Sequence, residues 1–411
     1  MGSNITPVPP APGDSPIFGR AGQVSRHRWK RVAGLVGAVI LGLAARSTAS
    51  AVTLDDLWRG TAHFEQVGEI DWVSAPQGSI GESSSWFTVR SGIWYAFNRV
   101  AMADPGGNCP STHMQIVVRE SRDQGRSWSD AKVAAAPGDS THGDGCAVLD
   151  GSGYFDATTG IWHLLAQCSD DRNQGGWAMC HYTRKAASPM GRFTPDPGNP
   201  VVKGGDLWAR ICDRTGSACP PTTVDEGTPE IIAQSNGQFL VTFHGFDYGS
   251  KRAFRGLAST SDFKSWRVEG AGLPGAPLLG ASECAHQLPH CVGVGQASTI
   301  FTEKYLYVLA EAMDKSLQCL SDQQWQFYLY RAPRGAFPQT GSKVWQTYPG
   351  SALLKPSSDD PATTCKVTYA RWIQDGSSTY LVYEDRITKS VYLNRRLLKL
   401  VPGSGAAIRL K

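Results

Sequence analysis

Alternating apolar and polar residues recur in five segments of the chain, and a turn interrupts each segment once. The segments are ESSSWFTVRSGIWYAFNR from Glu82, DGSGYFDATTGIWHLLAQ from Asp150, GTPEIIAQSNGQFLVTFH from Gly227, QASTIFTEKYLYVLAEA from Gln296 and TYARWIQDGSSTYLVYED from Thr368. Alternation has the two-residue period of a β-strand, and a Gly- or Asp-bearing turn between two such runs is the signal of a hairpin. The pattern therefore predicts five β-hairpins.

The five segments also align with one another, and only the fourth needs a deletion to do so. Shorter apolar runs follow them, such as MQIVVRES, WAMCHYTR and FYLYRAP. The roughly 60 to 80 residues from one segment to the next have room for four strands and their loops, the content of one propeller blade. We therefore expect an all-β chain folded as a β-propeller, with five blades of four antiparallel strands.

Composition agrees with many short strands and tight turns, because the chain has 45 Gly, 25 Pro and 13 Trp. The stretch SRDQGRSW from Ser121 resembles an Asp-box, S-x-D-x-G-x-x-W, and SDFKSW from Ser261 is a weaker copy. The Asp123 carboxylate is expected to cap the turn while Trp128 packs between strands, so this element is structural.

The N-terminal segment has the pattern of an export signal. A basic stretch, RHRWKR from Arg26, precedes an apolar run at 32–45, and Ala-Ser-Ala follows at 49–51. We expect residues 1–51 to be a disordered N-terminus plus a signal peptide cleaved after Ala51. The apolar run is too short to cross roughly 30 Å of hydrocarbon, so no stable membrane anchor is expected. Residues 52–411 are then one secreted propeller domain.

All ten cysteines lie beyond that segment, and their even number suits disulfides in an oxidising compartment. Short loops favour three pairs, namely Cys168 with Cys180, Cys212 with Cys219, and Cys284 with Cys291. Four cysteines are left to pair among themselves: Cys109, Cys146, Cys319 and Cys365.

The formal charge of +4 is small, and no dense basic block occurs after the N-terminus, so no nucleic-acid partner is expected. Metal-binding and phosphate-loop motifs are not found either, and we expect no metal and no cofactor. The sequence leaves the oligomeric state open.

Residues at the start of each aligned segment are expected to meet around the propeller axis. Glu82 and Asp150 open the first two segments, and Glu226 stands one residue before the third. Hydrolysis of a glycosidic bond needs one protonated carboxyl group as acid and one ionised carboxylate as base or nucleophile. We therefore take Glu82, Asp150 and Glu226 as catalytic candidates. Glu230 is the alternative acid if the register of the third segment is shifted.

Other polar residues near the same face are candidates for binding sugar hydroxyls. They are His142, Asp144, Gln296, Tyr369 and Arg371.

These features resemble the five-bladed glycoside hydrolases, the arabinanase and β-xylosidase family with its invertase and levansucrase relatives. The resemblance rests on Asp150 in DGSGYFDATTGIWHLL and on Glu226 in EGTPEIIAQSNGQFL. It implies an Asp base from the first blade, an Asp from the second that orients substrate and tunes the acid, and a Glu acid from the third. Glu82 differs from this pattern, since the family has Asp there and Pro where Ser83 follows.

The function expected from these residues and this resemblance is hydrolysis of glycosidic bonds in an extracellular polysaccharide, with an arabinan or other furanoside favoured. One alternative is a polysaccharide lyase that uses His142 and Tyr369 as acid and base and Arg371 to hold a uronate. A sialidase-like exo-glycosidase and a non-catalytic carbohydrate-binding propeller are the others.

Overall fold

The structure is a computed structural model, and it describes most of the chain from Ala51 onward. The described residues are 51–72, 76–103, 109, 113–170, 177–207, 223–247, 252–269, 291–314, 325–336, 345–349, 352–355, 367–386 and 393–409. The chain divides into Met1–Ala49 and Ser50–Lys411, and only the second part is described below. The predicted export signal therefore lies outside the described residues, apart from Ala51. No helix within these ranges is long and apolar enough to cross a bilayer.

Antiparallel pairing, with one parallel strand pair in the last group, divides the described strands into five groups, here called groups I to V. Group I contains β2 (Ser79–Arg90), β3 (Ile93–Met102), β4 (Met114–Ser121) and β5 (Lys132–Ala135). Group II contains β6 (Ala147–Asp156), β7 (Ile161–Ser169), β8 (Ala178–Arg184) and β9 (Thr194–Pro195). Group III contains β10 (Thr223–Ser235), β11 (Gln238–Asp247), β12 (Arg252–Thr260) and β13 (Trp266–Val268).

The last two groups take strands from both ends of the described chain. Group IV contains β14 (Cys291–Phe301), β15 (Tyr305–Asp314), β16 (Trp325–Pro333) and β17 (Gln346–Thr347), with the 3-10 helix η1 (Arg334–Ala336) after β16. Group V has the order β18 (Val367–Asp375), β19 (Ser378–Arg386), β20 (Leu393–Pro402), β1 (Ala62–Glu69) and β21 (Ile408–Arg409). A short helix, α1 (Leu54–Trp58), precedes β1. Pairing of β1 with β20 joins the start of the domain to its end.

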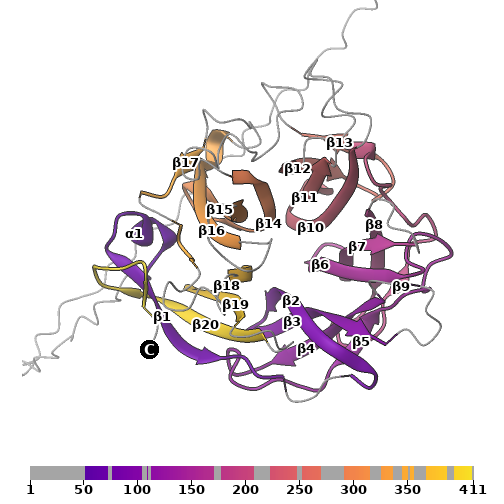
Figure 1. The fold of residues 1–411 in the computed structure, drawn as a ribbon, viewed down its shortest axis with the longest axis horizontal. Coiled ribbons are helices and arrows are strands. Elements are labelled where there is room, and N and C mark those ends of the chain that lie inside the picture. The colour runs from indigo at the N-terminus through magenta and orange to yellow at the C-terminus, as the bar shows by residue number, and fades with distance from the viewer. Residues whose placement is uncertain are drawn as a thin grey trace, which may run out of the picture. The chain divides into compact units, whose positions relative to one another are not determined.

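The five predicted hairpins all form. They are β2–β3, β6–β7, β10–β11, β14–β15 and β18–β19. The first strand of each group contacts the first strand of the next, from β2 through β6, β10, β14 and β18 and back to β2 (Figure 1). The prediction of an all-β chain is confirmed, and the five first strands are called inner strands from here on.

Side chains on the inner strands bond to the backbone of the neighbouring inner strand. Hydroxyl or carboxylate oxygens on one group accept an N–H from the next, at 2.9 to 3.2 Å. These bonds run from Ile231 N–H to Ser152, from Thr299 N–H to Glu230, and from Trp372 N–H to Ser298. Because a first strand has only one ladder partner within its own group, such bonds satisfy amides on its other edge.

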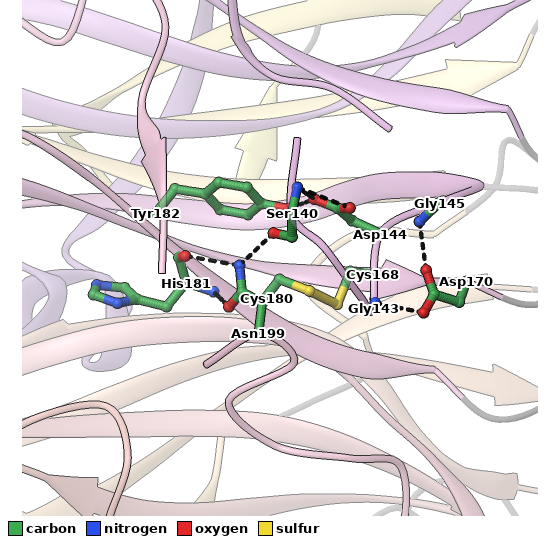
Figure 2. Close-up of a disulfide and its surroundings, with 10 residues drawn as sticks. All are labelled: Ser140, Gly143, Asp144, Gly145, Cys168, Asp170, Cys180, His181, Tyr182 and Asn199. Atoms are coloured by element: carbon green, nitrogen blue, oxygen red, sulfur yellow. Dashed lines mark hydrogen bonds between the residues drawn. A yellow bond between two sulfur atoms is a disulfide. The ribbon is translucent and has the colours of Figure 1, made fainter. Parts of the chain in front are cut away.

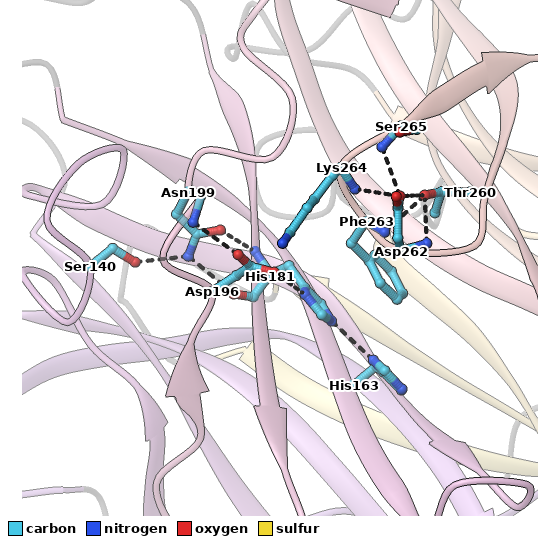
Figure 3. Close-up of polar contacts among 11 residues, drawn as sticks. Ser140, His163, His181, Asp196, Asn199, Thr260, Asp262, Phe263, Lys264 and Ser265 are labelled. Carbon is cyan, nitrogen blue, oxygen red and sulfur yellow. Dashed lines mark hydrogen bonds and ion pairs between the residues drawn. The ribbon is translucent and has the colours of Figure 1, made fainter.

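Groups II and III meet at a stack of neutral aromatic rings, here called the histidine stack (His163, His181 and Phe263). The ring of His181 lies 3.8 Å from that of Phe263, with 10° between the planes. His163 Nδ1 lies 3.0 Å from His181 Nε2, and His181 Nδ1 lies 3.2 Å from a carboxylate oxygen of Asp196 (Figure 3). Asp262 caps the turn that carries Phe263 by accepting the N–H groups at 264 and 265.

Groups V and I meet at a cluster that contains charged side chains, here called the arginine–tryptophan cluster (Trp72, Arg119 and Arg395). The Cζ atoms of Arg119 and Arg395 lie 4.8 and 5.0 Å from the centroid of the Trp72 ring. Trp72 packs edge-on against Trp128, which is buried, and Asp123 accepts the backbone N–H of Ser127 in the preceding turn.

One of the two described disulfides lies within group II, and the other lies beside it. The predicted Cys168–Cys180 bond is confirmed and joins β7 to β8. Cys109 pairs with Cys146, one of the pairings available to the four remaining cysteines. The side chains of the other predicted pairs, Cys212–Cys219 and Cys284–Cys291, lie outside the described residues, as do those of Cys319 and Cys365.

Candidate active site

Four inner strands carry a β-bulge whose residue has a positive φ. Ser84, Asp150, Thr228 and Tyr369 have φ values of 53°, 40°, 41° and 57°. Each lies where the ladder register shifts in its hairpin. A bulge frees one residue from the ladder and changes the direction of its side chain, and a non-glycine residue with positive φ costs about 1 kcal/mol or more. The repeated strain marks this level of the inner strands as the candidate site.

The bulges correct the register that the sequence alignment predicts between the first two segments. Ser84, and not Glu82, is the residue equivalent to Asp150. The reason is turn length, because the closing pair Arg90–Ile93 is joined by a two-residue turn and Asp156–Ile161 by a four-residue turn. When the two segments are aligned through their turns, the residues before the turn are therefore shifted by two positions, so that Glu82 is matched with Asp150.

Glu82 makes a buried ion pair with Arg119. The two guanidinium NH₂ groups of Arg119 donate to the two carboxylate oxygens of Glu82 at 2.8 and 2.9 Å. Arg119 is fully buried, and an Arg side chain there requires a charged partner. Both oxygens of Glu82 are therefore occupied by its own group.

Asp150 lies at the junction of groups I, II and V. Its Oδ2 accepts a hydrogen bond from Arg99 of β3 at 3.0 Å, and Arg99 also donates to the hydroxyls of Ser83 and Tyr369. Its Oδ1 is buried and has no hydrogen-bond partner among the described residues. One carboxylate oxygen of Asp150 is thus bound by Arg99, and the other makes no hydrogen bond to the described residues.

Glu226 is the fourth residue of β10 and lies two residues before the Thr228 bulge, as Glu82 lies two residues before Ser84. Its side chain is fully buried, and its N–H donates to the Trp177 carbonyl at 3.0 Å. The strand β10 contacts β6, which carries Asp150. Two carboxyl groups on adjacent inner strands therefore lie near the level of the bulges.

Glu230 lies further along β10, where it bonds to the next inner strand. Its Oε1 accepts the Thr299 N–H at 3.2 Å, and burial raises its pKa while the charges of Arg371 and Arg255 lower it less. Glu230 and Arg371 line a cavity among the inner strands beyond the bulges.

Gln296, Tyr369 and Arg371 lie close together, and many of their hydrogen bonds involve backbone groups. Arg371 donates to the Ala297 and Ala370 carbonyls at 3.2 and 3.0 Å and to the Gln296 side chain. The backbone N–H groups of Gln296 and Tyr369 donate to the two oxygens of Glu311 at 3.3 and 3.2 Å. Arg371 is thus held by protein oxygens, an arrangement that does not favour its predicted role in gripping a uronate.

His142 and Asp144 lie in the connection from β5 to β6, which is held by a polar network (Figure 2). Asp144 is buried and accepts the Tyr182 hydroxyl at 2.7 Å, and burial raises its pKa. Asp170 accepts the N–H groups of Gly143 and Gly145 at 2.5 and 2.7 Å. Asp144 therefore shapes the connection from inside, while His142 is exposed on it.

Sequence reasoning missed the cationic and acidic partners of these residues. Arg99 and Arg119 come from the second and third strands of group I, and Glu311 and Glu384 come from β15 and β19. Burial raises the pKa of Glu311 to about 7 and that of Glu384 to about 6. One signal for Arg119 was available, because it interrupts the apolar run MQIVVRES, where a buried cation requires a partner. Among the described residues, no group of three His, Cys, Asp or Glu is arranged to hold a metal ion.

Comparison with solved structures finds similar folds at low sequence identity. One glycoside hydrolase is 12% identical over 88% of this protein and 99% of that one, with a TM-score of 0.54. An α-L-arabinofuranosidase from Lactobacillus brevis is 10% identical over 79% and 94%, with a TM-score of 0.51. A thermostable family-43 glycoside hydrolase is 14% identical over 81% and 97%, with a TM-score of 0.50.

The chain thus has a fold similar to that of β-propeller-type glycoside hydrolases. No protein-family model matches it, and no curated protein sequence matches it either.

Proposed function

We propose that the protein is a secreted glycoside hydrolase whose active site lies at the bulges of the inner strands. The observation that carries the proposal is the pair of buried carboxyl groups, Asp150 and Glu226, on adjacent inner strands of a glycoside-hydrolase-like fold. In this proposal groups I to V are the five blades of one domain, residues 52–411. The two disulfides agree with export directed by residues 1–51.

Glu226 is proposed as the general acid, because it is a fully buried carboxyl group on the strand that contacts β6, which carries Asp150. Asp150 is proposed as its partner carboxylate, since Arg99 donates to one oxygen and the other accepts no bond among the described residues. It would orient the sugar or activate water. Glu82, bound at both oxygens by Arg119, is better suited to a structural role than to the first-blade base.

The substrate class is proposed from fold-level similarity alone. One neighbour is an α-L-arabinofuranosidase, which favours an arabinan or another furanoside over pyranose polymers. The lyase alternative has less support, because Arg371 is tied to carbonyl oxygens and His142 lies on an exposed connection.

The test is incubation of the secreted, oxidised protein with arabinans, xylan, galactofuranose-containing glycans, fructans and uronic-acid polymers. Reducing ends and ultraviolet absorbance are read together. New reducing ends without absorbance support the proposal. Absorbance indicates elimination by a lyase, and intact glycans despite binding indicate a binding module.

Matched substitutions then assign the roles. Glu226→Gln is expected to lower kcat by about 10²- to 10⁴-fold, the usual contribution of general acid–base catalysis. Glu303→Gln makes the same change at an exposed carboxylate and should leave hydrolysis unchanged. Full activity of Glu226→Gln together with loss in Glu230→Gln would transfer the acid role to Glu230.

A further inference from the structure

Polar side chains on the second strand of a group bond to the bulge residue of the next group. Three such bonds are described: Arg99 to the Asp150 side chain, Gln167 to the Thr228 N–H, and Glu311 to the Tyr369 N–H. A bulge residue is left out of its own ladder, so its polar groups need partners from elsewhere. The repeated bond therefore holds the level of the inner strands at which the candidate active site lies.

Gln167 is the member of this set that connects the strands of the two candidate carboxyl groups. It pairs with Leu149 in the β6–β7 ladder, and Leu149 directly precedes Asp150. Its Oε1 atom accepts the Thr228 N–H at 2.9 Å, and Thr228 lies two residues after Glu226 on β10. Gln167, Thr228 and Glu226 are all buried. One buried side chain therefore extends from the strand pair that holds Asp150 to the strand that holds Glu226.

The glycine between Glu226 and Thr228 leaves the space for this contact. A Cβ atom at residue 227 would collide with the Gln167 amide, whose Cδ atom would be only 2.5 Å away. Gly227 does not have a positive φ, so a left-handed backbone does not explain the glycine. The close approach of Gln167 does explain it.

The backbone on both sides of the Glu226 Cα atom is anchored on group II. The N–H of Glu226 donates to the Trp177 carbonyl at 3.0 Å, and the N–H of Thr228 donates to Gln167. Two anchors so close together in the chain limit how the Glu226 side chain leaves its strand. Asp150 belongs to the same group II, so these anchors also set where Glu226 lies relative to Asp150.

We propose that Gln167 is a positioning residue for Glu226 and fixes its separation from Asp150. The inference rests on the proposed function, in which these two carboxyl groups cleave the glycosidic bond. The separation of the two carboxyl groups decides whether a water fits between them, and a displacement of about 1 Å can lower a rate by roughly 10²-fold. Gln167 touches no substrate in this proposal, so its loss should lower kcat and leave KM nearly unchanged.

The test compares variants of the full secreted protein on the glycan that the unmodified protein hydrolyses. Gln167→Met removes the acceptor oxygen at a similar side-chain length, and should lower kcat about 10- to 100-fold while KM changes less than about twofold. Gln167→Glu keeps an acceptor oxygen and should recover most of the lost rate. Gln326→Met makes the same change at a buried glutamine of β16 in group IV and should leave kcat unchanged.

Hydrogen exchange of the backbone around Thr228, followed by mass spectrometry, reports the bond without hydrolysis. Exchange should be faster in Gln167→Met than in Gln167→Glu and in the unmodified protein. Faster exchange together with an unchanged kcat would overturn the inference, because the bond would then be structural only. A kcat loss no larger than that of Gln326→Met, or unchanged exchange in Gln167→Met, would also overturn it.

Gln167→Asn takes the place of Gln167→Met if that variant does not fold. It keeps the amide but withdraws its oxygen by one methylene group, and the same loss of kcat is expected. No hydrolysis by the unmodified protein would refute the proposed function and this inference with it. Active protein with an unchanged kcat in the Gln167 variants would refute this inference alone.

Discussion

The junction between groups II and III and the junction between groups V and I differ in the charge of the side chains that form them. The histidine stack holds neutral rings face to face, with Asp196 at one end. The arginine–tryptophan cluster instead holds two guanidinium groups over an indole, and the carboxylates of Glu82 and Glu384 pair with them. The first junction consists of neutral rings with a carboxylate at one end, whereas the second concentrates paired charges.

The difference follows from how the chain connects the groups. Groups II and III are successive in sequence, whereas groups V and I meet where the strand β1 at the start of the domain pairs with β20 near its end. A junction made of paired charges is specific, because a mismatched partner leaves a charge buried and unpaired. The charged junction adjoins the candidate site through Arg395, which donates to the Glu82 carbonyl at 2.9 Å.

The largest effect is expected from removing the anion of the charged junction. Glu82→Ala leaves Arg119 buried without its partner and should lower the free energy of unfolding by about 3–5 kcal/mol. Urea denaturation measures this loss. The double variant Glu82→Ala/Arg119→Met should recover most of it. If the Glu82→Gln protein folded stably but hydrolysed no glycan, the structural role assigned to Glu82 would be wrong. Glu82 would then again be a catalytic candidate.

A smaller loss is expected at the neutral junction. Phe263→Ala removes the ring that packs on His181 and Phe239 and should lower the free energy of unfolding by about 3 kcal/mol. Phe263→Leu keeps most of the volume and should lose about 1 kcal/mol. Calorimetric melting in both variants gives the ranking, and an equal loss in both would mean that the aromatic ring itself, and not its volume, stabilises the junction.

Acid should weaken the neutral junction by about 2–3 kcal/mol. Burial lowers the pKa of His163 to about 4, with a further contribution from His181, whereas Asp156 opposes the shift. Because the unfolded chain takes up the proton first, stability is complete above about pH 6.5 and falls as the pH drops toward 4. Asp196 and Lys264 also face this region, and the pKa of Asp196 is lowered chiefly by its bond to His181.

Urea unfolding at a series of pH values measures how the free energy of unfolding depends on pH. The His163→Leu variant provides the comparison. The variant should lose part of the pH dependence between pH 6.5 and 4. An unchanged slope would show that the histidine stack does not set the acid sensitivity.

The smallest effect is expected from a polar contact at the outer part of the charged junction. Asp375 accepts hydrogen bonds from the Trp94 indole and the Gln124 amide, both at 3.1 Å. Asp375→Ala should lower the free energy of unfolding by about 1 kcal/mol, since these bonds are partly exposed. Thermal melting resolves such a difference, and a loss as large as that of Glu82→Ala would remove the distinction between outer contacts and the buried pair.

Local patterns in the sequence were enough to predict the hairpins and one disulfide. Alternation and turn residues act over neighbouring positions, so the strands from Glu82 to Asn98 and from Asp150 to Gln167 could be recognised without tertiary contacts. Cys168 and Cys180 close a short loop, which made their pairing the natural interpretation. The positions of Asp150 and Glu226 at the start of inner strands followed from the same repeat.

Only the tertiary structure decided the register of the bulges and the partners of the carboxylates. Turn length changed the equivalence of Glu82 to Ser84, a shift that a repeated pattern with a period of two does not reveal. Arg119 and Arg99 approach Glu82 and Asp150 from other strands. The sequence by itself therefore determined which residues alternate and turn, whereas packing determined which charges meet, because ion pairs depend on distances between strands far apart in the chain.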